Sequence, residues 1–289
     1  MQLDHFCSHR RWCFRSLSMF PLHHILQRPP MRPDGQAVYE LRLADVVWKT
    51  EPALIAQFVC DRVLFGHVYR QLMSDHFTNM TTDSGVFIFP LVITQAIIPG
   101  AIRPGDIDIL VMPYHRDELI LDQILAIEVK VIRASFLKQG KSPNEYGFSQ
   151  ASSLLELGFP YAAVVHLITS DKSPRQAWEE TYFTTVLDNS GRVAAPQKIR
   201  TDLLSSNLVQ RAYGRLLKNS THPEIGFAAA YLYDALEKND TRILCMPFGQ
   251  DALRNPQRKS QTMRAAAEYF HRYALQAFDN PRGNELLLF

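Results

Sequence analysis

Apolar positions along this chain change their spacing several times, and each change predicts a different structural element. From residue 50 to about 77, apolar residues recur every three or four positions, which predicts an amphipathic helix. Three apolar runs follow, at 86–93, 106–111 and 124–132, and turn-forming residues separate them, so each predicts a strand. Because the three strands follow one another without a long helix between them, we expect an antiparallel meander.

The pattern then returns to helices. Residues 145–157 predict a helix that Gly158 ends, and 161–168 predict a buried strand. A further strand is expected near 181–187. The remaining positions predict helices at 202–218, 225–238 and 260–278, with one apolar strand at 243–247.

These elements predict an α/β fold with a central mixed β-sheet flanked by helices and a mainly helical C-terminal extension. The first 35 or so residues are rich in arginine and end in a proline-rich stretch at 28–33. We therefore expect a basic N-terminal arm or appendage at 1–45, a core at 46–190, and an extension at 191–289 that packs on the core.

Charged residues interrupt two of the apolar strands. Side chains alternate between the two faces of a strand, so Asp106 and Asp108 are expected to share one face. In the next strand, Glu128 and Lys130 share a face with apolar neighbours that read as buried. Burying an unpaired charge costs many kcal/mol, so these groups must pair with each other or hold a cation.

This combination resembles the PD-(D/E)-x-K nuclease superfamily, which has the restriction-endonuclease-like fold. The likeness runs from about 51 to 170: a helix, an acidic strand beginning Pro-Gly-Asp-Ile-Asp, a strand with Glu-Val-Lys, a crossover helix and another strand. It implies that Asp108, Glu128 and the backbone carbonyl of Val129 bind a metal ion. It further implies that Lys130 is catalytic together with Asp108 and Glu128.

The resemblance also suggests further site residues. Asp106 becomes an auxiliary ligand, and Glu51 a candidate ligand from the first helix, although an acid in a first helical turn also simply complements the helix dipole. Gln150 is similar to a glutamine that some branches place near the metal or the scissile phosphate. The branch with Gln-x3-Tyr has tyrosine where this chain has Leu154.

Oxygen ligands of this kind suit Mg²⁺, with Mn²⁺ as a substitute. The expected reaction is hydrolysis of a phosphodiester by metal-bound water, and Lys130 would orient the water and neutralise charge on phosphoryl oxygens. The resemblance favours DNA over RNA and a restriction, phage-defence or mobile-element context. The alternative is an inactive module with the same fold, in which the charged cluster is structural and the surface binds nucleic acid or a partner protein.

Net charge is only +2, so binding of a polyanion must come from local patches. One patch directly follows Lys130: Arg133, Lys138 and Lys141 lie in a stretch without acids. These cations are candidate nucleic-acid contacts. Tyr146 is a fourth candidate, able to stack on a base or simply to pack.

The remaining features concern the cellular setting. Four cysteines, widely spaced, are too few for a disulfide framework and lack the usual zinc spacing, which indicates a reducing cytoplasm. No apolar run is long enough for a membrane span. We expect a cytoplasmic protein that binds nucleic acid, with a homo-oligomer or a regulatory subunit as further expected partners.

Overall fold

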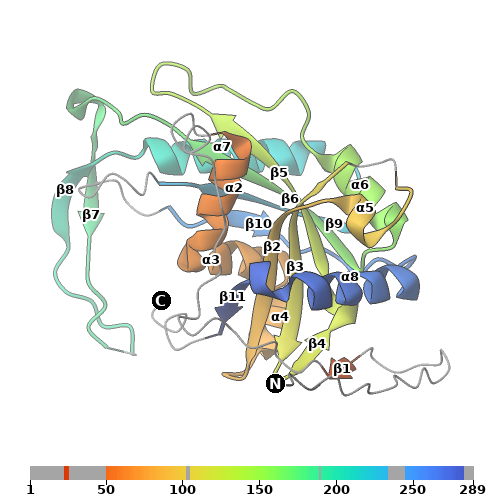
Figure 1. The fold of residues 1–289 in the computed structure, drawn as a ribbon. Coiled ribbons are helices and arrows are strands. Elements are labelled where there is room, and N and C mark those ends of the chain that lie inside the picture. Colours follow the sequence, from red (N-terminus) through yellow and green to blue (C-terminus); the bar gives the residue numbers. More distant parts are fainter. Residues whose placement is uncertain (1–22, 26–49, 102–104, 189, 234–244, 283–289) are drawn as a thin grey trace, which may run out of the picture.

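The computed structural model describes residues 23–25, 50–101, 105–188, 190–233 and 245–282. These residues form a mixed α/β fold around one large sheet, with helices on both faces (Figure 1). None of the helices in these ranges is long and apolar enough to cross a membrane. The predicted N-terminal arm lies outside the described residues except for a short strand, β1 (His23–Ile25).

Nine strands make up the large sheet in the described part of the chain. The order is β1-β4-β3-β5-β6-β9-β10, while β2 pairs with β3 and β11 pairs with β2. Their bounds are β2 (Ser84–Val92), β3 (Ile107–His115), β4 (Glu118–Ile120), β5 (Leu125–Arg133), β6 (Tyr161–Thr169), β9 (Ile225–Tyr231), β10 (Phe248–Gln250) and β11 (Phe278–Pro281).

The predicted meander is confirmed, since β2, β3 and β5 pair antiparallel. Helix α6 (Phe148–Leu157) then carries the chain from β5 to β6, which pairs parallel with β5, and β9 adds parallel to β6. Parallel pairing requires such a crossover, because the chain must return to the starting edge of the sheet.

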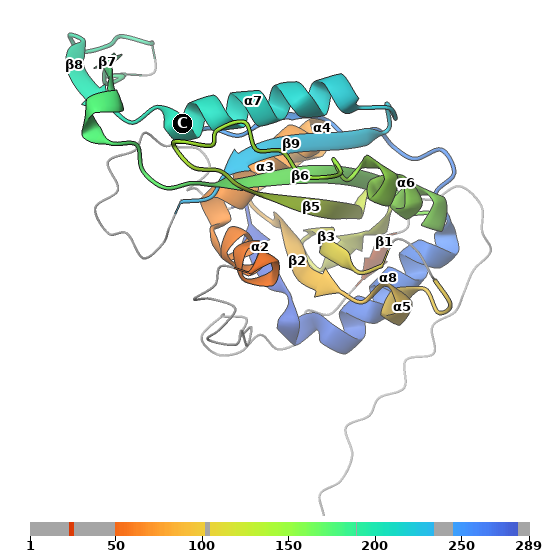
Figure 2. The ribbon, with the colours of Figure 1, turned by 90° about the horizontal axis from the view of Figure 1, so that it is seen from above.

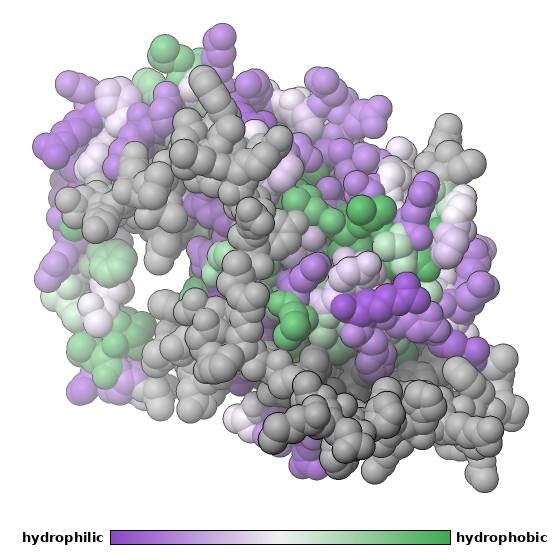
Figure 3. Space-filling model, viewed as in Figure 1, coloured by the Kyte–Doolittle hydropathy of each residue, from purple (hydrophilic) through white to green (hydrophobic). Residues whose placement is uncertain are grey.

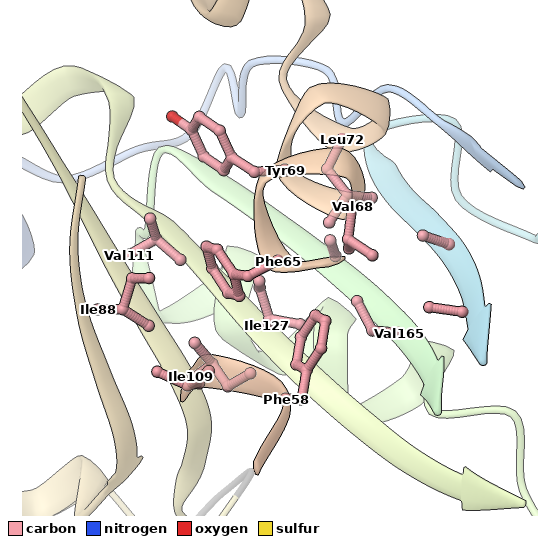
Figure 4. Packing of buried hydrophobic residues seen from close by; sticks show 14 of the residues in the cluster. Phe58, Phe65, Val68, Tyr69, Leu72, Ile88, Ile109, Val111, Ile127 and Val165 are labelled. Carbon is pink, nitrogen blue, oxygen red and sulfur yellow. The ribbon is translucent and has the colours of Figure 1, made fainter. Parts of the chain in front are cut away.

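One face of the sheet packs against the first helices, α2 (Glu51–Cys60) and α3 (Arg62–Leu72). Alternation along the strands produces this face, because every second residue of β3, β5 and β6 points toward these helices. Figure 4 shows the resulting core. Its side chains are Phe58, Phe65, Val68, Tyr69 and Leu72 from the helices and Ile88, Ile109, Val111, Ile127 and Val165 from the strands.

The other face carries two apolar clusters. Helix α8 (Ser260–Tyr273) packs against β2 and β3, while α6 and α7 (Leu204–Asn219) pack against β6 and β9. The sheet twists between these halves, so α7 and α8 lie at opposite sides of the molecule (Figure 2). Residues of β5 lie between the two clusters.

The predicted helix at 50–77 is three helices: α2, α3 and α4 (Ser74–Asn79). The first break lies at Asp61, whose Oδ1 accepts the backbone N–H of Leu64 at 3.0 Å and caps α3. A side-chain cap of this kind satisfies an N–H that the helix itself leaves unpaired. The three-to-four-residue spacing continues through the break and hides it.

The predicted helix at 225–238 is wrong, because residues 225–231 form β9 in the interior of the sheet. All seven residues are buried, so the strand lacks the alternation of a half-exposed strand. Its alanines favour a helix on propensity alone. A Cβ on Gly226 would lie 2.6 Å from the backbone nitrogen of Ala252, so glycine permits this close packing.

Two further predictions need correction. The strand predicted at 243–247 lies partly outside the described residues, and the strand observed there is β10, which begins at Phe248. The helix predicted at 260–278 ends at Tyr273, after which β11 pairs with β2 along the sheet edge. Among the described residues, the C-terminal third therefore contributes strands β9, β10 and β11 to the large sheet as well as helices α7 and α8.

Strands β7 (Glu179–Phe183) and β8 (Gln197–Thr201) form a separate two-stranded ribbon that projects from the body (Figure 1). The strand predicted near 181–187 corresponds to β7 and continues toward a single bridge between Val186 and Val193. Hydrophobic side chains are exposed on this ribbon, and Figure 3 shows them together with hydrophilic ones. The shorter helices α5 (Thr94–Ile97), η1 (Leu121–Gln123), η2 (Arg175–Ala177) and η3 (Ala274–Gln276) complete the fold.

Candidate active site

The candidate site lies where β3 and β5 separate. Their backbone pairing extends from Val111 to Ile109 on β3 and stops there, opposite Ile127. The next positions on the two strands are Asp108 and Glu128. Asp108 Oδ2 accepts the backbone N–H of Val129 at 2.7 Å, so a carboxylate takes the place of the missing strand partner.

Glu128 lies almost completely inside the protein, with 3% of its surface exposed. The Lys130 ammonium donates to Glu128 Oε1 at 2.8 Å. The side chain of Lys130 is more accessible, with 21% of its surface exposed, so the ion pair has a buried acidic end and a solvent-facing basic end. The predicted faces of β5 are confirmed: Leu125, Ile127 and Val129 pack toward α2 and α3, while Ala126 packs on the opposite side.

The electrostatic environment disfavours two negative charges here. Burial, and next the neighbouring carboxylate of Glu128, raise the pKa of Asp108 to about 7, against the lowering effects of the Val129 N–H and Lys130. Burial also raises the pKa of Glu128, which its hydrogen bond to Lys130 partly offsets. The single positive charge of Lys130 therefore does not neutralise the carboxylates of Asp108 and Glu128. A further cation would stabilise the ionised form of both.

Glu51 contributes to the same electrostatic environment. It is the exposed first residue of α2, followed by Pro52, and its charge raises the pKa of both Asp108 and Glu128. The described ranges contain no group of three His, Cys, Asp or Glu side chains arranged to hold a metal ion. Glu51 is thus a neighbour of the site in this structure, and its role as a ligand stays a prediction.

The oxygen donors present are nevertheless of the type that Mg²⁺ prefers. Asp108 and Glu128 each have a second carboxylate oxygen besides the one bonded to Val129 or Lys130. The N–H and C=O of one strand residue point to the same strand edge, so the Val129 carbonyl faces the edge on which Asp108 lies. These three residues are the ones that would hold the ion.

A glycine closes the site from the side of α6. Gly147 precedes the helix with a left-handed φ of 91°. A Cβ at this position would lie 3.3 Å from Glu128 Cγ and 3.5 Å from Lys130 Cε. The helix predicted to begin at residue 145 therefore begins at Phe148, because the preceding turn must pass close to both charged side chains.

Two aromatic rings support that turn. His166, fully buried on β6, lies beside Lys130 in the strand register, and its Nε2 is 3.2 Å from the carbonyl oxygen of Tyr146. The rings of Tyr146 and His166 stack with centroids 6.1 Å apart. Burial lowers the pKa of His166 to about 4, so the ring is neutral and its Nε2–H donates to the carbonyl. Tyr146 is half-buried and packs, which leaves its predicted contact with nucleic acid as a prediction.

The remaining predicted residues lie around this centre. Gln150 is in the first turn of α6, half-buried. Asp106 is exposed in the bend before β3. Arg133 is exposed at the end of β5, and Lys138 and Lys141 are exposed in the loop that follows. The structure joins Asp108 to Val129 and Glu128 to Lys130 by hydrogen bonds, and it shows no such bond from these two pairs to the other predicted residues among the described ones.

No family model, no curated protein and no solved structure matches this chain. Gly147 is the site residue that the sequence pattern missed. Its signal was a glycine directly before an apolar helical run, where a left-handed residue is common but not required.

Proposed function

We propose that the protein is a Mg²⁺-dependent nuclease that hydrolyses phosphodiester bonds, with a site of the PD-(D/E)-x-K kind. The observation that carries this proposal is the position of Asp108 and Glu128, a half-buried and a buried carboxylate on adjacent strands, with one ammonium on the solvent side of Glu128. A cluster with excess negative charge is costly unless it serves to bind a cation.

The side chains divide the work of an in-line hydrolysis. Asp108, Glu128 and the Val129 carbonyl would hold Mg²⁺, and the bound ion would supply a lowered pKa for water and neutralisation of phosphoryl charge. Lys130 lies at the solvent side of Glu128, where its ammonium stabilises the negative charge that grows on the phosphoryl oxygens. A water oxygen forms a new bond to phosphorus and releases a proton to solvent, the bond to the leaving oxygen breaks, and that oxygen takes up a proton from solvent.

The substrate proposed is nucleic acid, with DNA favoured. The exposed cations Arg133, Lys138 and Lys141 follow the catalytic strand directly, so phosphates bound there lie next to the site. A restriction, phage-defence or mobile-element system is the proposed context, with a regulatory subunit or a second copy of the chain as further partners.

Cleavage assays test this proposal. Supercoiled plasmid, single-stranded DNA and RNA would be incubated with Mg²⁺, with Mn²⁺ or with EDTA. Wild-type protein should cut DNA only with a divalent ion, and Asp108→Asn and Lys130→Ala should lose this activity. Lys198→Ala is the matched control, since Lys198 pairs with Glu180 at 2.6 Å on the distant ribbon and its loss should leave cleavage unchanged.

The second candidate is an inactive module that binds nucleic acid through the same face. It is favoured by the existing bonds of the cluster, in which Asp108 already bonds Val129 and Glu128 already bonds Lys130. Calorimetry distinguishes the two candidates. Mg²⁺ binding that Asp108→Asn abolishes supports the nuclease, and absence of any Mg²⁺ binding, together with no cleavage, supports the inactive module.

A further inference from the structure

The loop between β5 and α6, residues 134–147, arches over the end of the sheet (Figure 1). Leu137 lies in this loop with 88% of its surface exposed. Among the exposed large hydrophobic residues of the described chain, the next highest is Tyr182 at 74%. Single exposed leucines are common on protein surfaces, so exposure alone assigns no role to Leu137. Its setting does.

Leu137 stands on a turn that is fixed in place. Ser135 and Lys138 close the turn, because the Lys138 N–H donates to the Ser135 carbonyl at 3.0 Å and lies 3.0 Å from the Ser135 hydroxyl. On the inner side, Phe136 packs against the core, and its N–H donates to Asp171 Oδ1 at 2.7 Å. The turn therefore directs one apolar side chain inward and holds the next one out in solvent.

A second set of bonds ties the turn to α7. Gln139 Nε2 donates to the Phe136 carbonyl at 3.0 Å, and Arg211 donates to Gln139 Oε1 at 3.0 Å. A loop held by bonds to two other elements loses little conformational freedom when it binds a partner. The hydrogen bonds that fix the turn therefore also keep the Leu137 side chain in solvent.

The surroundings of Leu137 are cationic. Lys138 and Lys141 are exposed on the same loop, and Arg133 is exposed at its base. The nearby carboxylate of Asp171 is engaged by the Phe136 N–H. An apolar tip among cations suits a polyanion with an apolar interior, and base-paired DNA has charged phosphates outside and stacked bases inside.

We propose that Leu137 is a wedge that enters the base stack of duplex DNA beside the candidate active site, while Lys138 and Lys141 contact the flanking phosphates. Proteins insert apolar side chains between base pairs in this way, partly unstack them and kink the duplex. The loop begins four residues after Lys130 and ends at Gly147, where an added Cβ would lie 3.3 Å from Glu128 Cγ, so both ends of the loop adjoin the candidate site. This inference rests on the proposed function and adds that the substrate is double-stranded.

Fluorescence of 2-aminopurine tests the wedge, because this base brightens when it loses its stacking partner. Increasing amounts of full-length protein carrying Asp108→Asn, which prevents cleavage, would be added to DNA duplexes that hold the probe at successive positions. We expect a severalfold increase in fluorescence at one step. Adding Leu137→Ala should abolish the increase and weaken binding about tenfold, as loss of one buried apolar anchor implies.

Leu217→Ala is the matched control, because Leu217 is also exposed, at 53%, on the surface of α7. It should keep both the fluorescence increase and the affinity. An unchanged signal and affinity with Leu137→Ala overturns the wedge, as does binding that is confined to single-stranded DNA or an increase seen on duplex RNA but not on DNA. These outcomes leave Mg²⁺-dependent cleavage by the wild type standing, whereas absence of both cleavage and binding overturns the wedge and the nuclease together.

Discussion

Asp108 Oδ2 lies 2.7 Å from the backbone nitrogen of Val129, and this bond joins β3 to β5 just beyond their last backbone pair. It fixes the position of the Asp108 carboxylate relative to the strand that carries Glu128. The two carboxylates are thereby held near each other before any ion binds, and the cost is visible in the raised pKa of both.

Asp108→Asn should stabilise the metal-free protein. Asparagine keeps an oxygen for the Val129 N–H and removes a buried charge that Glu128 repels, so we expect the free energy of unfolding in EDTA at pH 8 to rise by about 1 kcal/mol. Urea unfolding measures this change. Mg²⁺ should raise the melting temperature of the wild type and leave that of the variant unchanged, because only the wild type binds the ion.

The control for this prediction is Asp202, a buried carboxylate that accepts the N–H groups of Ser173 at 2.9 Å and Leu204 at 3.0 Å. Both of its oxygens are bonded, so Asp202→Asn should lower the free energy of unfolding by about 1–2 kcal/mol. A loss of stability for Asp108→Asn as large as this would contradict the cation-binding interpretation.

Gly147→Ala should impair catalysis more than stability alone explains. The new Cβ meets Val164 Cγ1 at 3.1 Å, Glu128 Cγ at 3.3 Å and Lys130 Cε at 3.5 Å, and it also requires a left-handed alanine. We expect a loss of about 1–2 kcal/mol in stability and about a tenfold fall in the cleavage rate constant at saturating DNA.

Gly191→Ala separates the two effects. Gly191 has a similar φ of 82°, but its Cβ would meet nothing within 4 Å. It should lose a comparable amount of stability and retain full cleavage. Equal cleavage rates for the two variants would show that the close approach of Gly147 has no role in the site.

Lys130→Arg should be as inactive as Lys130→Ala. Arginine keeps the positive charge, but its broad planar head does not reproduce a compact ammonium 2.8 Å from Glu128 Oε1. Single-turnover cleavage measures the loss, expected to be at least a hundredfold, while affinity for DNA in a gel-shift assay should change less than threefold. Substantial cleavage by the arginine variant would mean that any cation suffices.

Acid should destabilise the protein through two histidines. Burial lowers the pKa of both His76 and His166 from 6.5 to about 4. Above pH 6.5 both the folded and unfolded states are neutral at these positions; below it the unfolded chain binds protons that the folded protein excludes. The stability that the two neutral histidines contribute is therefore complete above pH 6.5 and declines toward pH 4, by about 1–2 kcal/mol for each histidine between pH 7 and pH 5. Protonation of Asp108, whose pKa is raised to about 7, acts in the opposite direction over this range, so the histidine contribution is read from variants.

Glutamine has no ionisable side chain, so replacing each histidine by glutamine removes its protonation from the pH dependence of stability. The double variant His76→Gln, His166→Gln should lose less unfolding free energy than the wild type when the pH falls from 7 to 5. His222→Gln, at an exposed position, should retain the wild-type slope. The slope is the deciding quantity, since either replacement also changes packing.

The meander and the β5-α6-β6 crossover could be predicted from the sequence because their signals are local. Alternation in β5 placed Glu128 and Lys130 on one face, while Asp108 was singled out over Asp106 by the family resemblance alone. The break at Asp61 escaped prediction because one capping carboxylate interrupts the backbone without changing the apolar spacing.

Strand β9 was mistaken for a helix because tertiary context decides its structure. Its small residues pack between β6 and β10 and are buried on both faces, so neither propensity nor alternation reveals a strand. The approach of Gly147 to Glu128 and Lys130 was equally hidden, because those residues are 17 or more positions away in sequence and meet only after α6 docks.

The large sheet combines strands from the first part of the chain with β9 and β11 from its last third, and this limits how the protein can be divided into fragments. A fragment that ended near residue 190 would lack both β9 and β11 and so would leave β6 and β2 with bare backbone edges. Such a fragment should aggregate instead of yielding a minimal catalytic unit. Biochemistry on this chain therefore calls for point substitutions in the intact polypeptide.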